Sequence, residues 1–272
     1  MEATAQRLLE AASTFVAEHP ENALGAHGGM RIYDAPLMAV ADAGDPLFER
    51  LQDETVVGPH HRLPREWLCS ARRVVSFFLP FTLEVRRTNR GEGLPSEEWT
   101  SARIDGEAFN QTLREYLRDL IRSWGQEAVI PPLEEGFAIS KRRANWSERH
   151  VAFVAGLGTF GLSSSFITAR GSAGRLGSLV TSLLLPVTDR KATGIYDFCL
   201  WHQGGRCRQC MDRCPAGAIS EAGKDVALCA NYLDEQIRPR FWPRYGCAKC
   251  QVGVLCEECA PQAAEGSTCA RI

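Results

Sequence analysis

The sequence predicts an α+β protein with two domains that meet near residue 195. Segments with helical and with strand-like hydrophobic spacing follow one another through residues 1–195. Ten of the eleven cysteines lie at or after Cys199, and only Cys69 precedes them. A chain of 272 residues is long enough for two domains. We therefore expect an α/β domain over residues 1–195 and a cysteine-rich domain over residues 196–272.

Amphipathic helices are expected at three places in the first domain. Residues 4–19 carry apolar side chains at helical spacing, and Pro20 stands just beyond their end. Residues 106–124 give the strongest helical pattern, with one apolar and one charged side, and Gly125 follows as a stop signal. A shorter helix is expected to begin at Pro46.

One strand dominates the expected sheet. Residues 73–81 form a nearly continuous apolar run, which is the pattern of a strand covered on both faces. Shorter strands are expected at residues 37–41 and 128–130. Residues 84–98 are polar and contain glycine and proline, so they predict an exposed loop.

A glycine-rich turn over residues 156–161 follows a helix expected from residue 145 to 155. Two apolar, strand-like segments come after it, at residues 166–168 and 176–186. The G-x-G-x-x-G spacing resembles a dinucleotide fingerprint, but that fingerprint leaves a strand and enters a helix, and the order here is reversed. The turn is therefore either a tight helix-to-strand connection, which the residues alone favour, or a cradle for another ligand.

The cysteine-rich domain has a spacing typical of iron–sulfur proteins. Residues 207–215 read C-x2-C-x3-C-P, which matches the end of the bacterial ferredoxin run, whose last cysteine binds the other of two clusters. Gly204 stands where the first cysteine of that run belongs, and Cys199 is its nearest replacement. Residues 215–219 are expected to form the short helix that follows such a cluster.

Eight thiolates would hold two 4Fe–4S clusters. We assign Cys199, Cys207, Cys210 and Cys256 to one cluster, and Cys214, Cys229, Cys247 and Cys250 to the other. Cys259 is the alternative to Cys256, because the spacing does not separate them, and Cys269 is left unassigned. Tetrahedral zinc also uses C-x2-C pairs and remains the alternative metal, with a disulfide framework as a third interpretation. The cysteine directly before Pro215 favours iron–sulfur clusters, because a zinc site has no use for it.

Composition excludes several partner classes. The formal net charge of −2 gives no electrostatic footprint for nucleic acid. The first residues lack a basic region followed by an apolar core, so no signal peptide is expected, and the longest apolar runs are too short to span a bilayer. We expect a cytoplasmic protein with reduced thiols and no membrane partner.

Residues 145–256 resemble the epoxyqueuosine reductase family and its relatives among cobalamin and iron–sulfur reductases, which include reductive dehalogenases. The matching features are Glu148-Arg149, A-G-L-G-x-x-G at residues 155–161, the strand ending at residues 181–186, the C-P pair at Pro215, Cys229 with Tyr232-Leu233, and Tyr245-Gly246-Cys247-x2-Cys250-Gln251-Val252. The resemblance implies a cobalamin-binding domain with a nitroreductase-like fold, followed by a ferredoxin-like domain. The inner of its two 4Fe–4S clusters would pass electrons to cobalt.

The resemblance also implies a cofactor site and partners. The corrin edge would pack against the glycine-rich turn and the polar residues after it, at Gly156, Gly158, Thr159, Phe160, Gly161 and Ser163. The aspartate that donates a proton in the family corresponds here to Arg142, so no catalytic acid is assigned. His150, Tyr196 and His202 are the nearest side chains with exchangeable protons.

A reduced ferredoxin or flavodoxin is the expected electron donor, and a small organic molecule the expected substrate, whereas nucleic acid is not expected. The reaction class would be reductive removal of a leaving atom. The alternative function is a ferredoxin-type electron carrier that serves a partner enzyme, such as a corrinoid enzyme, without a cobalamin of its own. A zinc-stabilised interaction module is the third interpretation.

Overall fold

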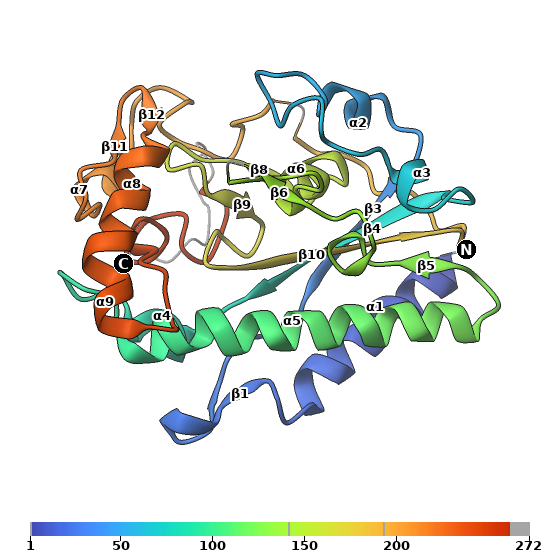
Figure 1. Ribbon diagram of the computed structural model, residues 1–272, viewed down its shortest axis with the longest axis horizontal. Helices are drawn as coiled ribbons and strands as arrows, with labels where there is room; N and C mark the ends of the chain where they lie inside the picture. Colours follow the sequence, from blue (N-terminus) through green and yellow to red (C-terminus); the bar gives the residue numbers. More distant parts are fainter. Residues whose placement is uncertain (1, 141, 193, 262–272) are drawn as a thin grey trace.

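The computed structural model describes residues 2–140, 142–192 and 194–261. Its centre is a four-stranded antiparallel sheet in the order β3-β4-β10-β5, with helices on both faces (Figure 1). The four strands are β3 (Leu37–Asp42), β4 (Arg73–Pro80), β10 (Gly174–Thr181) and β5 (Ala128–Val129). The mixed helix and sheet class predicted from the sequence is confirmed.

The remaining elements before residue 195 are short, apart from two long helices. They are α1 (Glu2–Glu18), β1 (Ala23–Leu24), η1 (Gly25–His27), β2 (Met30–Arg31), α2 (Pro46–Arg50), α3 (Pro64–Trp67), α4 (Leu83–Thr88), α5 (Glu97–Ser123), η2 (Pro131–Leu133), β6 (Ile139–Ser140), β7 (Arg143–Ala144), α6 (Glu148–Val154), β8 (Gly158–Phe160) and β9 (Phe166–Thr168). The helices α1 and α5 lie together on one side of the sheet, and α6 lies on the other (Figure 1).

Strand β4 separates two apolar cores. Val75, Phe77 and Leu79 point into the core beneath α1 and α5, whereas Val74 packs into the core beneath α2 and α6. From its second residue onward the strand is buried, which confirms the prediction of a strand covered on both faces. In the second core the indole nitrogen of Trp146 donates a hydrogen bond of 2.9 Å to Ser178 Oγ.

The predicted exposed loop at residues 84–98 is wrong at both ends, where α4 and α5 lie, whereas residues 89–96 do connect the two helices and residues 91–94 are exposed. Thr82 accepts a hydrogen bond from Val85 N and thereby starts α4, and Ser96 does the same for Trp99 N at the start of α5. The helix α5 therefore begins nine residues before the predicted residue 106. Arginines made the α4 segment look solvent-exposed, but Arg86 is only 8% exposed because acidic partners far along the chain cover it.

Residues 196–261, which we call the cysteine-rich segment, lie at one end of the sheet (Figure 1). Its elements are α7 (Gln209–Asp212), β11 (Ile219–Ser220), β12 (Gly223–Lys224), α8 (Val226–Tyr232), the π-helix η3 (Leu233–Ile237), α9 (Arg238–Phe241) and η4 (Lys249–Gln251). The short helix expected at residues 215–219 is absent, since Cys214 is followed by a turn that leads into β11. Within the described ranges, no helix combines the length and apolar character needed to cross a membrane.

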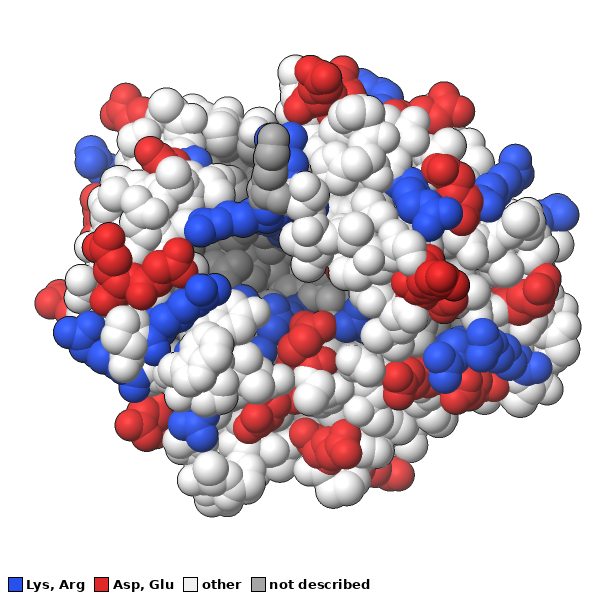
Figure 2. Space-filling model, in the orientation of Figure 1, with Lys and Arg blue, Asp and Glu red and all other residues white. Residues whose placement is uncertain are grey.

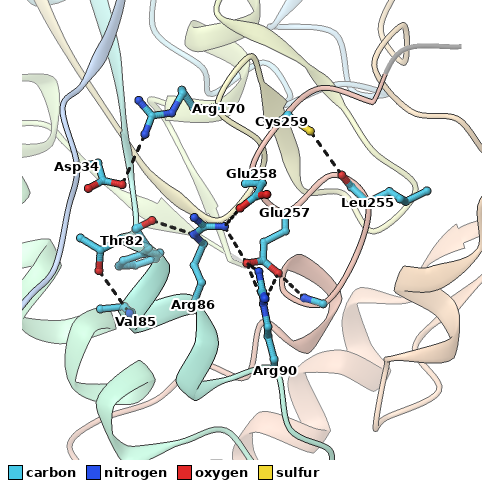
Figure 3. Close-up of polar contacts among 12 residues, drawn as sticks. Asp34, Thr82, Val85, Arg86, Arg90, Arg170, Leu255, Glu257, Glu258 and Cys259 are labelled. Atoms are coloured by element: carbon cyan, nitrogen blue, oxygen red, sulfur yellow. Dashed lines mark hydrogen bonds and ion pairs between the residues drawn. The ribbon is translucent and has the colours of Figure 1, made fainter. Parts of the chain in front are cut away.

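A buried ion-pair network fixes the cysteine-rich segment to α4. Figure 3 shows Arg86 and Arg90 converging on Glu257 and Glu258. Arg86 Nη1 lies 2.8 Å from Glu257 Oε1 and 2.8 Å from Glu258 Oε2, and Arg90 Nη2 lies 2.7 Å from Glu257 Oε1. Glu257 is fully buried and also accepts a hydrogen bond of 2.6 Å from Gly253 N. We call these four side chains the latch.

Candidate cofactor site

Three cavities meet at residues 161–165, which connect β8 to β9 and which we call the serine loop. Ser163, Ser164 and Ser165 face the first cavity, and Gly161 and Leu162 face the second and third. Ser163 Oγ and Ser165 Oγ are 2.8 Å apart and buried, so the loop is internally braced. The loop therefore lies in the wall of every cavity described below.

The first cavity, which we call the large cysteine cavity, has a volume of about 420 Å³. Its wall combines β10 and the serine loop with the cysteine-rich segment. It contains one complete set of the predicted ligands: Cys214, Cys229, Cys247 and Cys250. Three separate pieces of chain supply these cysteines: the turn after α7, the middle of α8, and residues 247–250, which lead into η4 and contain two of them.

The second cavity, which we call the small cysteine cavity, has a volume of about 30 Å³ and contains the other predicted set. Cys199, Cys207, Cys210 and Cys256 line it, together with apolar residues that include Leu162, Ile167 and Val254. Ser172 anchors the last cysteine twice, because its N donates to the Cys256 carbonyl at 2.8 Å and its Oγ lies 3.8 Å from Cys256 Sγ. Cys259 is disulfide-bonded, and Cys269 lies outside the described residues.

Burial raises the pKa of five of these thiols. It raises the pKa of Cys250 and Cys256 to about 12 and the pKa of Cys210 to about 11, and neighbouring cysteines add to the effect. The pKa of Cys207 and of Cys247 is raised for the same reason. Thiolates in these positions therefore need a cationic partner that displaces their protons. Within the described ranges, no three His, Cys, Asp or Glu side chains converge on one point that would suit a single metal ion.

Basic side chains outnumber acidic ones in the large cysteine cavity. Its charged lining residues are Arg103, Arg114, Arg149, Arg175, Lys224 and Lys249 against Glu107 and Glu148. Figure 2 shows that Lys and Arg side chains also border the hollow on the face presented there. Lys249 is buried between two of the cysteines in sequence, and its Nζ donates to the carbonyls of Asn89 at 3.1 Å and Gly91 at 2.7 Å. The cavity is therefore suited to a group with net negative charge.

The third cavity, which we call the aromatic cavity, has a volume of about 650 Å³. It brings together the three proton-bearing side chains that the sequence singled out. The rings of Tyr196 and His202 stack with centroids 3.9 Å apart, and the ring of His150 lies 4.9 Å from that of Phe160. Burial lowers the pKa of His150 to about 4, so this imidazole is neutral at physiological pH.

The predicted corrin contacts divide into two groups. Gly156 ends α6 with a φ of +83°, Gly158 pairs with Thr168 between β8 and β9, and Thr159 Oγ1 accepts a hydrogen bond of 2.9 Å from Phe198 N. None of these three residues lines any of the three cavities described above. Phe160, Gly161 and Ser163 do line them. The first half of the glycine-rich turn thus has a backbone role, and the second half faces the cavities.

Replacing Gly158 with alanine is expected to destabilise the protein by about 1–3 kcal/mol, the usual cost of forcing extra volume into a packed site. A Cβ there would lie 2.0 Å from the Ile167 carbonyl oxygen, so β8 and β9 would have to separate. Chemical denaturation measures the effect. Gly161→Ala is the matched control and is expected to cost less, because its Cβ would meet only side-chain atoms, Ile167 Cδ1 at 3.1 Å and Ser165 Oγ at 3.3 Å. An unchanged midpoint for Gly158→Ala would contradict the close strand pairing.

Arg142, which the resemblance matches to the family aspartate, is exposed and does not line any of the three cavities. Its Nη2 lies 3.4 Å from Asp234 Oδ2 in the cysteine-rich segment, with 59% of the arginine side chain exposed. Sequence reasoning noted Glu148 only as part of a motif. It missed that this side chain lines the large cysteine cavity, because the burial of a carboxyl group depends on elements distant in sequence.

Comparison with known proteins gives a consistent family. No protein-family model matches the chain. The chain is 30% identical over 203 residues to an epoxyqueuosine reductase of Escherichia coli, a match that covers 70% of this chain and 49% of that protein. It is 34% identical over 115 residues to an epoxyqueuosine reductase of Bacillus anthracis, covering 39% of this chain and 28% of that protein. The chain thus spans about half the length, or less, of these curated relatives.

Solved structures show the same fold. A selenomethionine-labelled epoxyqueuosine reductase matches with a TM-score of 0.54 at 17% identity, covering 92% of this chain and 64% of that chain. A catabolic reductive dehalogenase matches with a TM-score of 0.51 at 16% identity, covering 76% of this chain and 28% of that chain. These likenesses establish the mixed helix and sheet fold that the sheet topology displays. The curated matches support placing the chain in the epoxyqueuosine reductase family, and the reductive dehalogenase shares its fold.

Proposed function

We propose that the chain is an oxidoreductase that binds two 4Fe–4S clusters and passes their electrons to a cobalamin, which reduces a small organic substrate. The observation that supports this most is the division of eight cysteines into two sets of four, each lining its own cavity. The two sets are those expected if Cys214 and Cys256 cross over between the cysteine groups, as in two-cluster ferredoxins. We further propose a nitroreductase-like domain over residues 1–195 and a ferredoxin-like domain over residues 196–272.

The donor sets fit iron–sulfur clusters. A 4Fe–4S cluster binds four thiolates at four separate irons, so its ligands surround a volume and do not converge on one point. With four thiolate ligands the cluster carries net negative charge, which the excess of Arg and Lys around the large cysteine cavity would offset. Cys199, Cys207, Cys210 and Cys256 would hold one cluster, and Cys214, Cys229, Cys247 and Cys250 the other.

The same cavity offers a place for cobalamin beside the second cluster. Ser163 and Ser164 of the serine loop face the cavity from one side, and Gly246 and Tyr232 face it from the other. Phe160 and Gly161 would approach the cofactor from the aromatic cavity. When bound, cobalamin would supply one-electron redox chemistry at its cobalt. The protein supplies binding, orientation and adjustment of potential.

The partners follow from this chemistry. The electrons would come from a low-potential protein such as a reduced ferredoxin or flavodoxin, and a small organic molecule would be the substrate. One solved relative is an epoxyqueuosine reductase with a tRNA stem loop, at 18% identity to this chain. The net charge of −2 argues against a nucleic-acid substrate for this chain.

Titration with cobalamin tests the proposal. Protein reconstituted with iron and sulfide without oxygen should bind one cobalamin per chain, as followed by the absorption and electron paramagnetic resonance spectra of the cobalt. Addition of a low-potential reductant should then reduce the bound cobalt more slowly in variants that lack the second cluster. Protein that holds both clusters but leaves cobalamin free in solution would contradict the proposal and favour the electron-carrier function.

A further inference from the structure

Two carboxyl groups line the large cysteine cavity, and their surroundings differ. Glu107, on α5, is paired on both oxygens: its Oε1 lies 2.6 Å from Arg114 Nη2 and its Oε2 lies 2.9 Å from Arg175 Nε. Its side chain is also 46% exposed. Both oxygens of Glu107 therefore have close basic partners.

Glu148, in the first turn of α6, has a single and longer ion pair. Both of its carboxyl oxygens are buried, and neither has a hydrogen bond, although the side chain as a whole retains 21% of its exposure and lines the cavity. The nearest cation is Arg114, whose Nη1 lies 3.5 Å from Glu148 Oε1. That guanidinium is already committed through Nη2 to Glu107 and through Nε to the Asn110 carbonyl.

Burial has a larger effect on the pKa of Glu148 than any of the groups that face it from neighbouring elements. Burial raises the pKa of Glu148; Arg114 on α5 and Ser178 on β10 act in the opposite direction, and Glu107 adds to the rise. Ser178 Oγ accepts the Trp146 hydrogen bond, which leaves its hydroxyl proton to point toward Glu148. Two carboxyl groups in one cavity with opposite surroundings is the arrangement in which one is an acid and the other a charged partner.

We propose that Glu148 is the proton donor of the large cysteine cavity. The assignment rests on the proposed function, because replacing a leaving atom X by hydrogen consumes two electrons and one proton: R–X + 2e⁻ + H⁺ gives R–H + X⁻. The electrons come one at a time from the low-potential donor through the clusters. The proton comes from Glu148, and Arg114 stabilises the carboxylate that remains until water from the cavity reprotonates it. Arg142, which the resemblance matches to the family aspartate, is too exposed and too basic for this task.

Infrared difference spectroscopy on the full chain, without cobalamin, tests the assignment. At neutral pH, wild type minus Glu148→Gln should show the carbonyl stretch of a neutral carboxylic acid, and wild type minus Glu107→Gln should not. The band should shift within minutes in D₂O, because the proton exchanges with cavity water. Reduction of the clusters should also shift it, since the added electron lies in the same cavity.

The outcomes separate this inference from the proposed function. Absence of the Glu148 band at neutral pH, or a band that does not shift after hours in D₂O, would overturn the role of Glu148. Neither result would bear on whether the chain binds cobalamin. Failure of cobalamin to bind would overturn the proposed function without changing this spectrum. If Glu148→Gln does not fold, Glu148→Asp provides the same test, because it should keep an acid band with a shifted frequency.

The pH dependence of stability gives a second readout. Because the pKa of Glu148 is raised on folding, its contribution is complete at acidic pH and is lost as pH rises through the folded pKa. Glu148→Gln carries no ionisable group, so its melting temperature relative to wild type should rise from mildly acidic to mildly alkaline pH. A difference that is constant across this range would mean that Glu148 is ionised throughout and would overturn the assignment.

Discussion

Alanine in place of Cys207 is expected to remove about four of eight irons, and alanine in place of Cys214 the same number from the other cluster. The two residues are close in sequence, yet they line different cavities, with Cys207 in the small one and Cys214 in the large one. Iron and acid-labile sulfide per chain measure the loss. Electron paramagnetic resonance of the reduced variants shows which cluster is left, because each variant should keep a different signal.

Cys69→Ala is the matched control for both variants. Cys69 is an exposed free cysteine outside the cysteine-rich segment, so its loss should leave iron, sulfide and both signals unchanged. Full iron in both the Cys207 and the Cys214 variants would refute the ligand assignment. Retention of the same signal by both variants would refute the crossing over of ligands between the two clusters.

Replacing Glu257 with glutamine is expected to lower the free energy of unfolding by about 3–5 kcal/mol, the cost of breaking one side of a buried ion pair. Glu257 is fully buried and pairs with both Arg86 and Arg90. The substitution therefore removes the negative charge that balances two guanidinium groups. Glu257 also follows Cys256 directly in the chain. Denaturant unfolding measures the loss, and the cluster held by Cys256 should be the first to leave.

Glu258→Gln is the control for this prediction. Its carboxylate pairs with the same Arg86, but 32% of its side chain is exposed, so the expected cost is about 1 kcal/mol or less. If the Glu257 variant and wild type unfold at the same denaturant concentration, the latch does not stabilise the contact between α4 and the cysteine-rich segment.

Local pattern was enough to predict most of the central sheet and its long helices. The hydrophobic patterns of β4 and α1 are clear in the sequence because β4 is buried on both faces and α1 is buried along one face. The segment around Arg86 was misjudged for the opposite reason. Its burial depends on Glu257, which is 171 residues away, and no local pattern carries that information.

In the site, too, some features could be predicted from local sequence and others depend on contacts between distant residues. The motif that ends at Pro215 predicted how the cysteines divide, because in it the last cysteine binds the other of two clusters. The choice between Cys256 and Cys259 needed the tertiary structure, which puts Cys256 beside Ser172 and in the wall of the small cysteine cavity. The resemblance assigns Gly156 and Gly158 to a cofactor site, whereas the residues alone favour a tight turn; in the structure the two glycines lie at a helix end and in a close strand pair, where glycine is also required.

The most direct test of the central claim is the content of iron, acid-labile sulfide and cobalt in protein purified without oxygen and incubated with cobalamin. The account predicts about eight irons, about eight sulfides and one cobalt per chain. Zinc in place of iron, with no acid-labile sulfide, would contradict it and make the cysteine-rich segment a zinc-stabilised module.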